Sequence, residues 1–295
     1  MNRPTHRLAQ PWIAAALLAP ALILLTVFAF VPTAATLWDS FFREAMPTRS
    51  PRFVGLGVYR SVIADPVFWQ VARNNLIYAA STITLSTAIA FGMALWANAK
   101  LPGRALVRLA YFTPTVLPMI AAANLWLYFY TPDIGVFDRI GSWFGAGRIN
   151  WLGEPGTALW AVIVVAVWKE AGFFMIFYLA ALQSIPADLR EAARIEGAGR
   201  LTCVRRVVWP LLMPTTIFIA VNALINSVSL IDHLFILTRG GPDNASKLLL
   251  YWVWENAFTY FDQASAAALT VIILLVLAVA AIAQMRWAER RTHYQ

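Results

Sequence analysis

Long runs of apolar residues alternate with shorter polar segments along the whole chain. A membrane-spanning helix needs about 20 predominantly apolar residues, and six runs reach this length. The predicted spans are residues 12–38, 71–98, 106–131, 158–182, 208–231 and 265–287. Pro114 and Pro118 fall inside the third run and predict a kink there. The pattern predicts an all-α polytopic membrane protein with six transmembrane helices in a single domain, residues 1–295.

Arg3 and Arg7 precede the first apolar run, as cations do in a signal peptide. Its apolar core, however, extends from Trp12 to Val31 and exceeds the about 7–15 residues of a signal peptide's apolar region. We therefore predict that this run is a retained span.

Composition supports the membrane class. The chain is 60% hydrophobic and 13% charged, whereas soluble proteins have about 45–50% apolar and about 25% charged residues. The net charge of +8 could suggest nucleic acid. The cations lie between the apolar runs, however, and no basic stripe interleaved with aromatic residues occurs, so no nucleic-acid partner is expected. Cys203 is the only cysteine, which excludes an internal disulfide.

Lysine and arginine residues are divided unevenly between the two sets of loops, and cytoplasmic loops carry the larger share. The set that includes both termini carries thirteen of them, in the shorter loops, and the other set carries nine. This bias predicts that both termini and residues 185–197 are cytoplasmic. The longer loops, residues 39–70, 132–157 and 232–264, are predicted to lie outside, as partner surfaces or as plain connections.

No motif in the chain indicates catalysis or a bound cofactor. A phosphate-binding loop of the G-x-x-x-x-G-K-[ST] type is absent, because none of the three lysines follows a glycine. His6, His233 and His293 are far apart in different loops or tails, and no zinc motif or nucleophile elbow occurs. We expect no catalytic residue, no metal site and no cofactor on this chain.

Residues 185–197 predict a short amphipathic helix between the fourth and fifth spans. Pro186 suits its first turn, Asp188 lies where the helix dipole favours an anion, and Gly197 is placed to end it. Its predicted apolar face consists of Ile185, Leu189, Ala192 and Ala193. An interfacial helix resting on lipid headgroups is one alternative. The small apolar face and the alternating charges favour the other, a docking helix for a cytoplasmic partner.

This segment resembles the EAA loop of ABC-importer permeases. Glu191, Ala192 and Ala193 are followed by Gly197 after three residues, and Pro210 closes the pattern. Glu196, Val204 and Trp209 stand where that family usually has aspartate, phenylalanine and leucine. The resemblance continues outside the loop, in segments similar to the carbohydrate-importer branch: residues 65–75, 114–118, 182–193, 237–246 and 251–258. Within that branch, the arrangement is most similar to the first permease subunit of sn-glycerol-3-phosphate importers.

The resemblance implies the transmembrane domain of a type I importer in a bacterial inner membrane. The expected partners are a second permease subunit, two ATPase subunits that hold ATP and magnesium, and an extracytoplasmic solute-binding protein. The residues implied at the ATPase contact are Glu191, Ala192, Ala193, Arg194, Glu196, Gly197 and Pro210. The loop implied to face the binding protein contains Gly240, Gly241, Pro242 and Asp243.

Polar residues inside the predicted spans are candidates for a substrate pathway, because ionisable groups there are costly and usually functional. They are Asn124, Lys169, Glu170, Asn222, Asn226 and Ser229. Amides and hydroxyls suit a sugar, a polyol or sn-glycerol-3-phosphate, and Trp126, Tyr128 and Trp168 could stack on sugar rings. The alternative is that these groups join helices to one another.

Two other functions are compatible with a polytopic chain. An ion-coupled secondary transporter would need no docking helix and usually shows internal repeats, of which none is clear here. A membrane enzyme or assembly scaffold would need a catalytic set that the sequence does not display.

Overall fold

Helices make up nearly all of the computed structural model, which describes residues 11–43, 52–99, 103–145 and 148–289. The helices of eight or more residues are α1 (Pro11–Leu25), α2 (Val31–Asp39), α3 (Gly57–Ala64), α4 (Pro66–Ala97), α5 (Arg104–Val116), α6 (Met119–Tyr130), α7 (Val136–Trp143), α8 (Ala158–Ser184), α9 (Ala187–Ile195), α12 (Met213–Ser229) and α15 (Gln263–Glu289). The shorter ones are α10 (Arg200–Cys203), α11 (Trp209–Leu211), α13 (Asp232–Leu237) and α14 (Leu249–Trp254), with π-helical turns η1 (Thr26–Phe30), η2 (Val204–Val208) and η3 (Glu255–Thr259). In the described chain, β structure is limited to β1 (Phe42–Arg43) paired antiparallel with β2 (Arg52–Phe53). The all-α fold class is confirmed.

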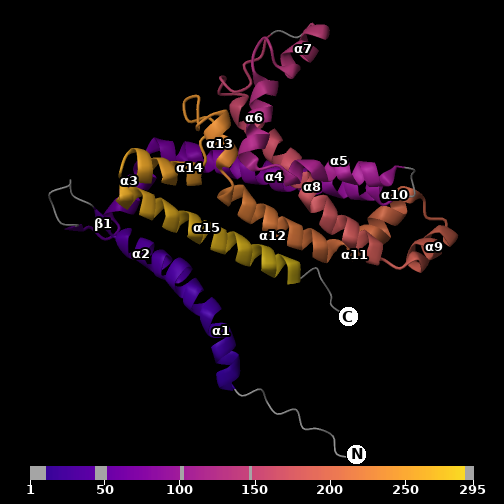
Figure 1. Ribbon diagram of the computed structural model, residues 1–295, viewed down its shortest axis with the longest axis horizontal. Helices are drawn as coiled ribbons and strands as arrows, with labels where there is room; N and C mark the ends of the chain where they lie inside the picture. Colours follow the sequence, from indigo (N-terminus) through magenta and orange to yellow (C-terminus); the bar gives the residue numbers. More distant parts are fainter. Residues whose placement is uncertain (1–10, 44–51, 100–102, 146–147, 290–295) are drawn as a thin grey trace, which may run out of the picture.

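Five helical segments of the described chain are long and apolar enough to cross a membrane. They are Trp12–Asp39, Pro66–Ala97, Ala158–Ser184, Met213–Leu237 and Gln263–Arg286, and the bent pair α5 and α6 makes a sixth if both helices form one span. Figure 1 shows α9 and α10 at one end of the molecule and α3, β1 and α14 at the opposite end. The segment with α9 and α10 therefore lies far from the one with α3 and β1, while α7 projects from the middle of the bundle.

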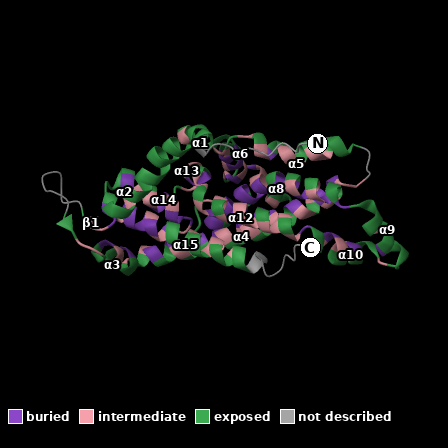
Figure 2. Ribbon diagram, turned by 90° about the horizontal axis from the view of Figure 1, so that it is seen from below, coloured by how far each residue is buried: buried purple, intermediate pink, exposed green. Residues whose placement is uncertain are grey.

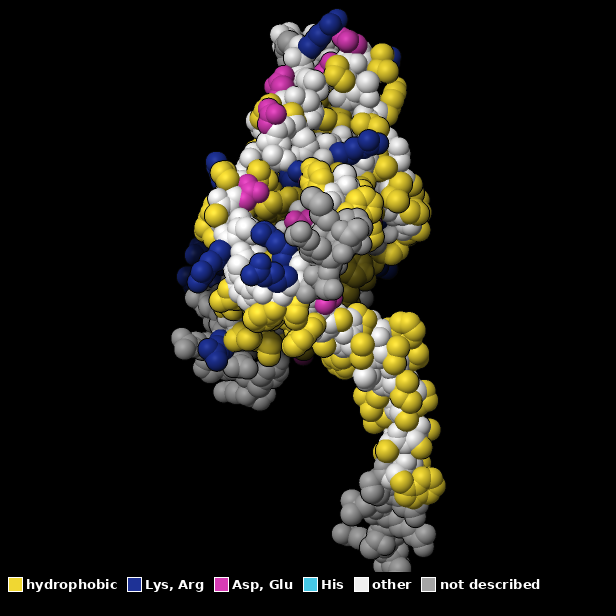
Figure 3. Space-filling model, turned by 90° about the vertical axis from the view of Figure 1, so that its left-hand side faces the viewer, with side chains coloured by type: hydrophobic (Ala, Val, Ile, Leu, Met, Phe, Trp, Pro, Cys, Tyr) yellow, Lys and Arg dark blue, Asp and Glu magenta, His cyan; other side chains and the backbone are white. Residues whose placement is uncertain are grey.

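The first span stands apart from the others. None of its apolar window is buried within the chain, and α1 projects away from the body as an almost entirely hydrophobic column (Figures 1 and 3). Lipid or another subunit must cover this surface, because so large an apolar area is unfavourable in water.

The third predicted span, residues 106–131, is broken. The axes of α5 and α6 differ by 102°, far more than the kink that Pro114 and Pro118 predict. Leu117 is extended at ψ 134°, as a residue before proline prefers, and Pro118 itself lacks the N–H that would continue the helix. The chain turns at this pair, and α6 then packs against α13 rather than continuing along α8.

Small residues allow α4 and α8 to pack closely along most of their length. The seam on α4 is buried at Thr82, Ser86, Ala90, Ala94 and Ala97, at spacings of three or four residues that place them on one face. Small side chains let helix backbones approach in a membrane. Helices α5 and α12 each pack against both members of this α4–α8 pair.

Figure 2 shows the buried residues along the inside of the bundle, where they form separate clusters, and two of these lie beside the candidate site. One cluster joins α6, α13 and the first half of α8, with Trp126, Tyr130 and Leu234 among its members. The other joins the second half of α8 to the segment that follows it, and it includes Tyr178 and Ala193. The short helices after α8 are therefore part of the packed fold.

Candidate functional site

Helix α9 ends in a specific backbone geometry at Gly197. Glu196 is its C-cap, Gly197 has φ 81°, and the N–H of Ala198 donates to the carbonyl of Ala193 at 2.9 Å. The N–H of Gly197 donates to the carbonyl of Arg194 at 3.0 Å. This pair of bonds is the Schellman motif, which requires the left-handed residue that glycine adopts without strain. The helix is two residues shorter at each end than the predicted 185–197, and Pro186 precedes its first turn.

The face that α9 turns toward the body is narrower than the periodicity predicts. Ala193 and the preceding Ile185 are buried in the cluster under the helix. Leu189 is 44% exposed, and Ala192 is exposed as well. The outward surface consists of Glu191, Ala192, Arg194, Ile195 and Glu196, all exposed. With Ile195 at 88% exposure, the helix presents an apolar residue among charges, away from its own protein.

The segment after α9 returns directly to the bundle. From Gly199 the chain continues as α10 and η2 into α11, which contains the exposed Pro210. Leu201 lies on α10, which contacts α9. It is 80% exposed and is therefore a second outward apolar residue in this region, in addition to Ile195. Trp209 packs edge-on against Phe91 of α4, with ring centroids 5.0 Å apart. The ring at this position, where the resembling family has leucine, is therefore packed against the bundle rather than turned outward.

The ammonium group of Lys169 caps the broken end of α5. Its Nζ donates to the carbonyls of Pro114 at 3.2 Å, Thr115 at 3.4 Å and Leu117. The last carbonyls of a helix carry partial negative charge and have no partner within the helix. Lys169 is half-buried in α8 and is fully engaged by this break. No ion pair joins it to Glu170 in the described chain, as their adjacent positions predict.

Glu170 faces a different helix from Lys169. It is 8% exposed, and the side chain of Asn226 on α12 reaches its carboxyl group. Its Oε2 has no hydrogen-bond partner among the described residues. A buried polar atom without a partner is uncommon in proteins, so this carboxyl oxygen stands out among the polar atoms of the described spans.

The other polar candidates are dispersed. The amide of Asn124 donates to Ile120 on its own helix at 2.8 Å and is exposed on α6. Asn222 likewise donates to Phe218 at 2.8 Å, and Ser229 is exposed at the end of α12. Of the sequence candidates, the fold brings together Glu170 and Asn226. Among the aromatic candidates, Trp126 and Trp168 are in edge contact at 5.5 Å, whereas Tyr128 is 50% exposed.

One buried polar contact was missed by the sequence analysis. The hydroxyl of Tyr78 lies 3.1 Å from Nε2 of His233, and these side chains are 2% and 0% exposed. The prediction that His233 lies in a loop is wrong, because α13 continues the apolar run and carries the ring into the core. His6 and His293 lie outside the described residues. Among the described residues, no group of three metal-ligating side chains occurs.

The predicted partner loop between α13 and α14 is only partly accessible. Gly240 is buried, Gly241 and Pro242 are half-buried, and Asp243 is exposed, as is the neighbouring Arg239. An outward contact at this loop would therefore be made by charged side chains rather than by its glycines.

Known proteins resemble the chain over nearly its full length. The trehalose/maltose transport system permease protein MalF of Thermococcus litoralis is 32% identical over 261 residues, covering 88% of each chain. The sn-glycerol-3-phosphate transport system permease protein UgpA of Agrobacterium fabrum is 31% identical over 281 residues, covering 94% of this chain and 95% of UgpA.

The fold is shared with solved transporter structures. A subunit of a bacterial ABC transporter involved in import of the acidic polysaccharide alginate aligns with a TM-score of 0.84 at 23% identity, covering 96% of each chain. This match shows the fold of a type I ABC-importer transmembrane domain. Residues 86–294 also match the model of a protein family described as the binding-protein-dependent transport system inner membrane component. The chain therefore belongs to this family of inner-membrane permease subunits of ABC transporters.

Proposed function

We propose that this chain is one of two permease subunits of an ATP-driven importer for a sugar, a polyol or sn-glycerol-3-phosphate. Both termini and α9 lie in the cytoplasm, and a solute-binding protein delivers the substrate from outside. The chain itself holds no ATP and no catalytic residue. The carbohydrate class is supported by relatives named for trehalose/maltose and for sn-glycerol-3-phosphate transport.

The observation that carries the proposal is the outward face of α9. Glu191, Ala192 and Ile195 are exposed on a helix whose opposite side is anchored in the core through Ala193. An apolar residue flanked by charges suits a protein pocket, in which the apolar side chain is buried and the charges pair at the rim. In this proposal, α9 docks on a cytoplasmic ATPase subunit, and closure of the two ATPases moves α9 together with the end of α8.

The substrate pathway is proposed to run beside Glu170 and Asn226. Their side chains meet between α8 and α12, and one carboxyl oxygen has no partner in the described chain. A carboxylate and an amide can bind the hydroxyl groups of a polyol or sugar. Lys169 is proposed to support the wall of this pathway and not to bind substrate, since its ammonium donates hydrogen bonds to the carbonyls of α5.

The proposal is tested by assembling this chain with its second permease and ATPase subunits in proteoliposomes. We expect no ATP hydrolysis from the purified chain alone, and ATPase activity of the complex that rises with a substrate-loaded solute-binding protein. Ile195→Asp should abolish this stimulation while the chain still inserts in the membrane. Wild-type stimulation in Ile195→Asp would show that α9 is not the docking helix.

An ion-coupled secondary transporter makes the opposite prediction. Its uptake would survive ATP depletion and stop when the ion gradient is collapsed. Family membership argues against this alternative, and the two depletion experiments separate the mechanisms in the same vesicles.

A further inference from the structure

The loop of residues 238–247, between α13 and α14, has an unusual backbone conformation. Three of its non-glycine residues have positive φ: Arg239 at 51°, Asp243 at 47° and Asn244 at 59°. Asp and Asn adopt positive φ readily in turns, whereas for the arginine this conformation is disfavoured. Such conformations persist only where the surrounding contacts enforce them, and they cluster at ligand clamps and switch regions. The contacts that enforce this loop are therefore informative.

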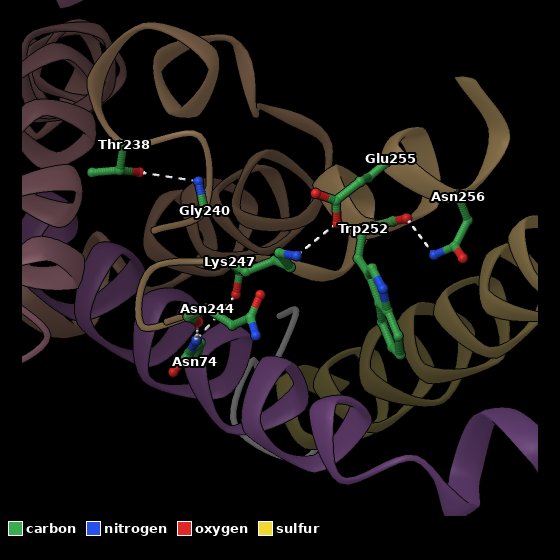
Figure 4. Close-up of polar contacts among 8 residues, drawn as sticks. All are labelled: Asn74, Thr238, Gly240, Asn244, Lys247, Trp252, Glu255 and Asn256. Carbon is green, nitrogen blue, oxygen red and sulfur yellow. Dashed lines mark hydrogen bonds and ion pairs between the residues drawn. The ribbon is translucent and has the colours of Figure 1, made fainter. Parts of the chain in front are cut away.

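Amide side chains of α4 donate hydrogen bonds to backbone carbonyls on one side of the loop. Gln70 donates to the carbonyl of Asp243 at 2.8 Å, and Asn74 donates to the carbonyl of Asn244 at 2.8 Å and of Lys247 at 3.2 Å. Figure 4 shows Asn74 beneath Asn244 on the α4 ribbon. Asp243 and Asn244, which have positive φ, thus have their carbonyls bound to side chains of one helix.

A buried ion pair holds the loop from the other side. Nζ of Lys247 lies 2.6 Å from Oε2 of Glu255 on η3, and these side chains are 9% and 15% exposed (Figure 4). The Lys247 side chain runs directly against Gly240, where an added Cβ would lie 3.1 Å from its Cε. Removing one member of a buried ion pair leaves an uncompensated charge, so the loop depends on both residues.

We infer that Lys247 and Glu255 are positioning residues that hold the 238–247 loop as a preformed docking surface for the solute-binding protein. The inference rests on the proposed function and adds to it which residues shape the contact. Arg239 and Asp243 are the exposed charged side chains of this loop, and no large apolar side chain of the loop is exposed. Charges of both signs suit complementary pairs on a soluble protein, whereas an anionic lipid surface would attract cations alone.

The conformation of the loop can be measured without any partner. In a Cys203→Ala chain, Asp243→Cys carries a nitroxide label whose electron paramagnetic resonance spectrum reports local mobility. We expect an immobilised label in the parent chain and a mobile label after Lys247→Met or Glu255→Gln. The exchanged pair, Lys247→Glu with Glu255→Lys, should restore most of the immobilisation. An equally immobilised label in all variants would overturn the positioning role.

The exposed pair Arg148–Asp133 provides a matched control. Its atoms are 2.7 Å apart, but its side chains are 81% and 53% exposed, and exposed pairs contribute little to stability. Arg148→Met should therefore leave the spectrum of the label unchanged. Mobilisation by Arg148→Met as well would mean that loss of a charge elsewhere in the chain also loosens this loop, and the specific role of Lys247 would be rejected.

Docking is measured in the assembled complex, with Asp243 intact and with the solute-binding protein that stimulates the wild-type ATPase. If Lys247→Met leaves the loop competent about one tenth of the time, the half-saturating concentration of that protein rises about ten-fold. The maximal stimulated rate should stay near wild type, because α9 is unchanged. A lower maximal rate at unchanged half-saturation would contradict the docking role. If no binding protein stimulates the wild-type complex, the proposed function itself fails, while the label still decides the positioning role.

Discussion

Nζ of Lys169 on α8 lies 3.2 Å from the carbonyl oxygen of Pro114 on α5, so a cation inside one span closes the broken end of another. The contact explains how a chain can turn by 102° among apolar helices. Unpaired backbone groups within a membrane are costly unless a neighbouring group pairs with them, and the ammonium serves three carbonyls at once.

Lys169→Met should destabilise the chain because it leaves those carbonyls without a donor. Hydrogen bonds to a charged group contribute about 2 kcal/mol, so we expect a clearly lower unfolding temperature in detergent. Lys169→Arg, which retains the charge and the donors, should have an unfolding temperature between those of Lys169→Met and the parent chain. Arg73→Met, at an exposed position of α4, is the control. A Lys169→Met chain as stable as this control would refute the capping role.

Gly172 and Gly92 form a matched pair of helix glycines. A Cβ on Gly172 would lie 2.2 Å from the backbone carbonyl oxygen of Tyr111, whereas a Cβ on Gly92 meets nothing within 4 Å. We expect Gly172→Ala to destabilise the α5–α8 contact by about 2 kcal/mol, as overpacking does. Gly92→Ala should be neutral or stabilising by about 0.5 kcal/mol. Thermal unfolding of both variants measures the difference, and equal unfolding temperatures would contradict the close approach of α5.

Substitutions at Gly197 and Gly199 distinguish the effect of backbone conformation from the effect of packing. Neither glycine has an atom within 4 Å of an added Cβ, but Gly197 has φ 81° whereas Gly199 has φ −63°. Gly197→Ala should cost about 1 kcal/mol and loosen the end of α9, which lowers the ATPase stimulation of the assembled complex. Gly199→Ala should retain nearly normal stimulation. The same activity in both variants would show that the end of α9 does not affect coupling.

Glu170→Gln tests the proposed pathway. The variant removes a buried charge while keeping the size of the side chain, so we expect normal insertion and a changed substrate concentration for half-maximal uptake. Asn226→Ala should change the same parameter, because the two side chains meet. Ser61→Ala, on α3, is a control outside the pathway. Unchanged uptake kinetics in both Glu170→Gln and Asn226→Ala would remove these residues from the pathway.

The orientation of the chain can be tested with single cysteines, because Cys203 is the only cysteine and is buried. In a Cys203→Ala chain produced without its ATPase subunits, which would cover α9, a membrane-impermeant maleimide added to intact cells should label Asp243→Cys and leave Ala192→Cys unlabelled. Both positions are exposed in this chain. Labelling of Ala192→Cys from outside would reverse the orientation derived from the loop charges. Opening the cells is the control, since it should make Ala192→Cys reactive.

Features that depend on a few neighbouring residues were predictable. The apolar runs identify a helical membrane protein, because each needs only its own length and polarity to favour a membrane. The end of α9 at Gly197 follows from a glycine after a short amphipathic segment. The site of the turn between α5 and α6 follows from Pro118, although its angle does not.

Features that depend on helix neighbours were not predictable. The predicted apolar face of residues 185–197 included Leu189 and Ala192, whereas only Ile185 and Ala193 are covered by α8 and its neighbours. His233 was expected in a loop, because the break before α13 hides that the apolar run continues beyond it. No pattern indicated the pair of Lys247 and Glu255, since alternation of polarity does not tell which side chains meet.

By itself, the sequence determined that the chain lies in a membrane as a set of helices, and where a short charged helix interrupts them. Hydropathy and backbone preference act over a few neighbouring residues and are readable along the chain. The tertiary structure decided that Lys169 turns toward α5 while Glu170 turns toward α12, and that α4 and Lys247 hold the loop between α13 and α14. These outcomes depend on which helices become neighbours, because a buried polar group must find its partner wherever packing places one.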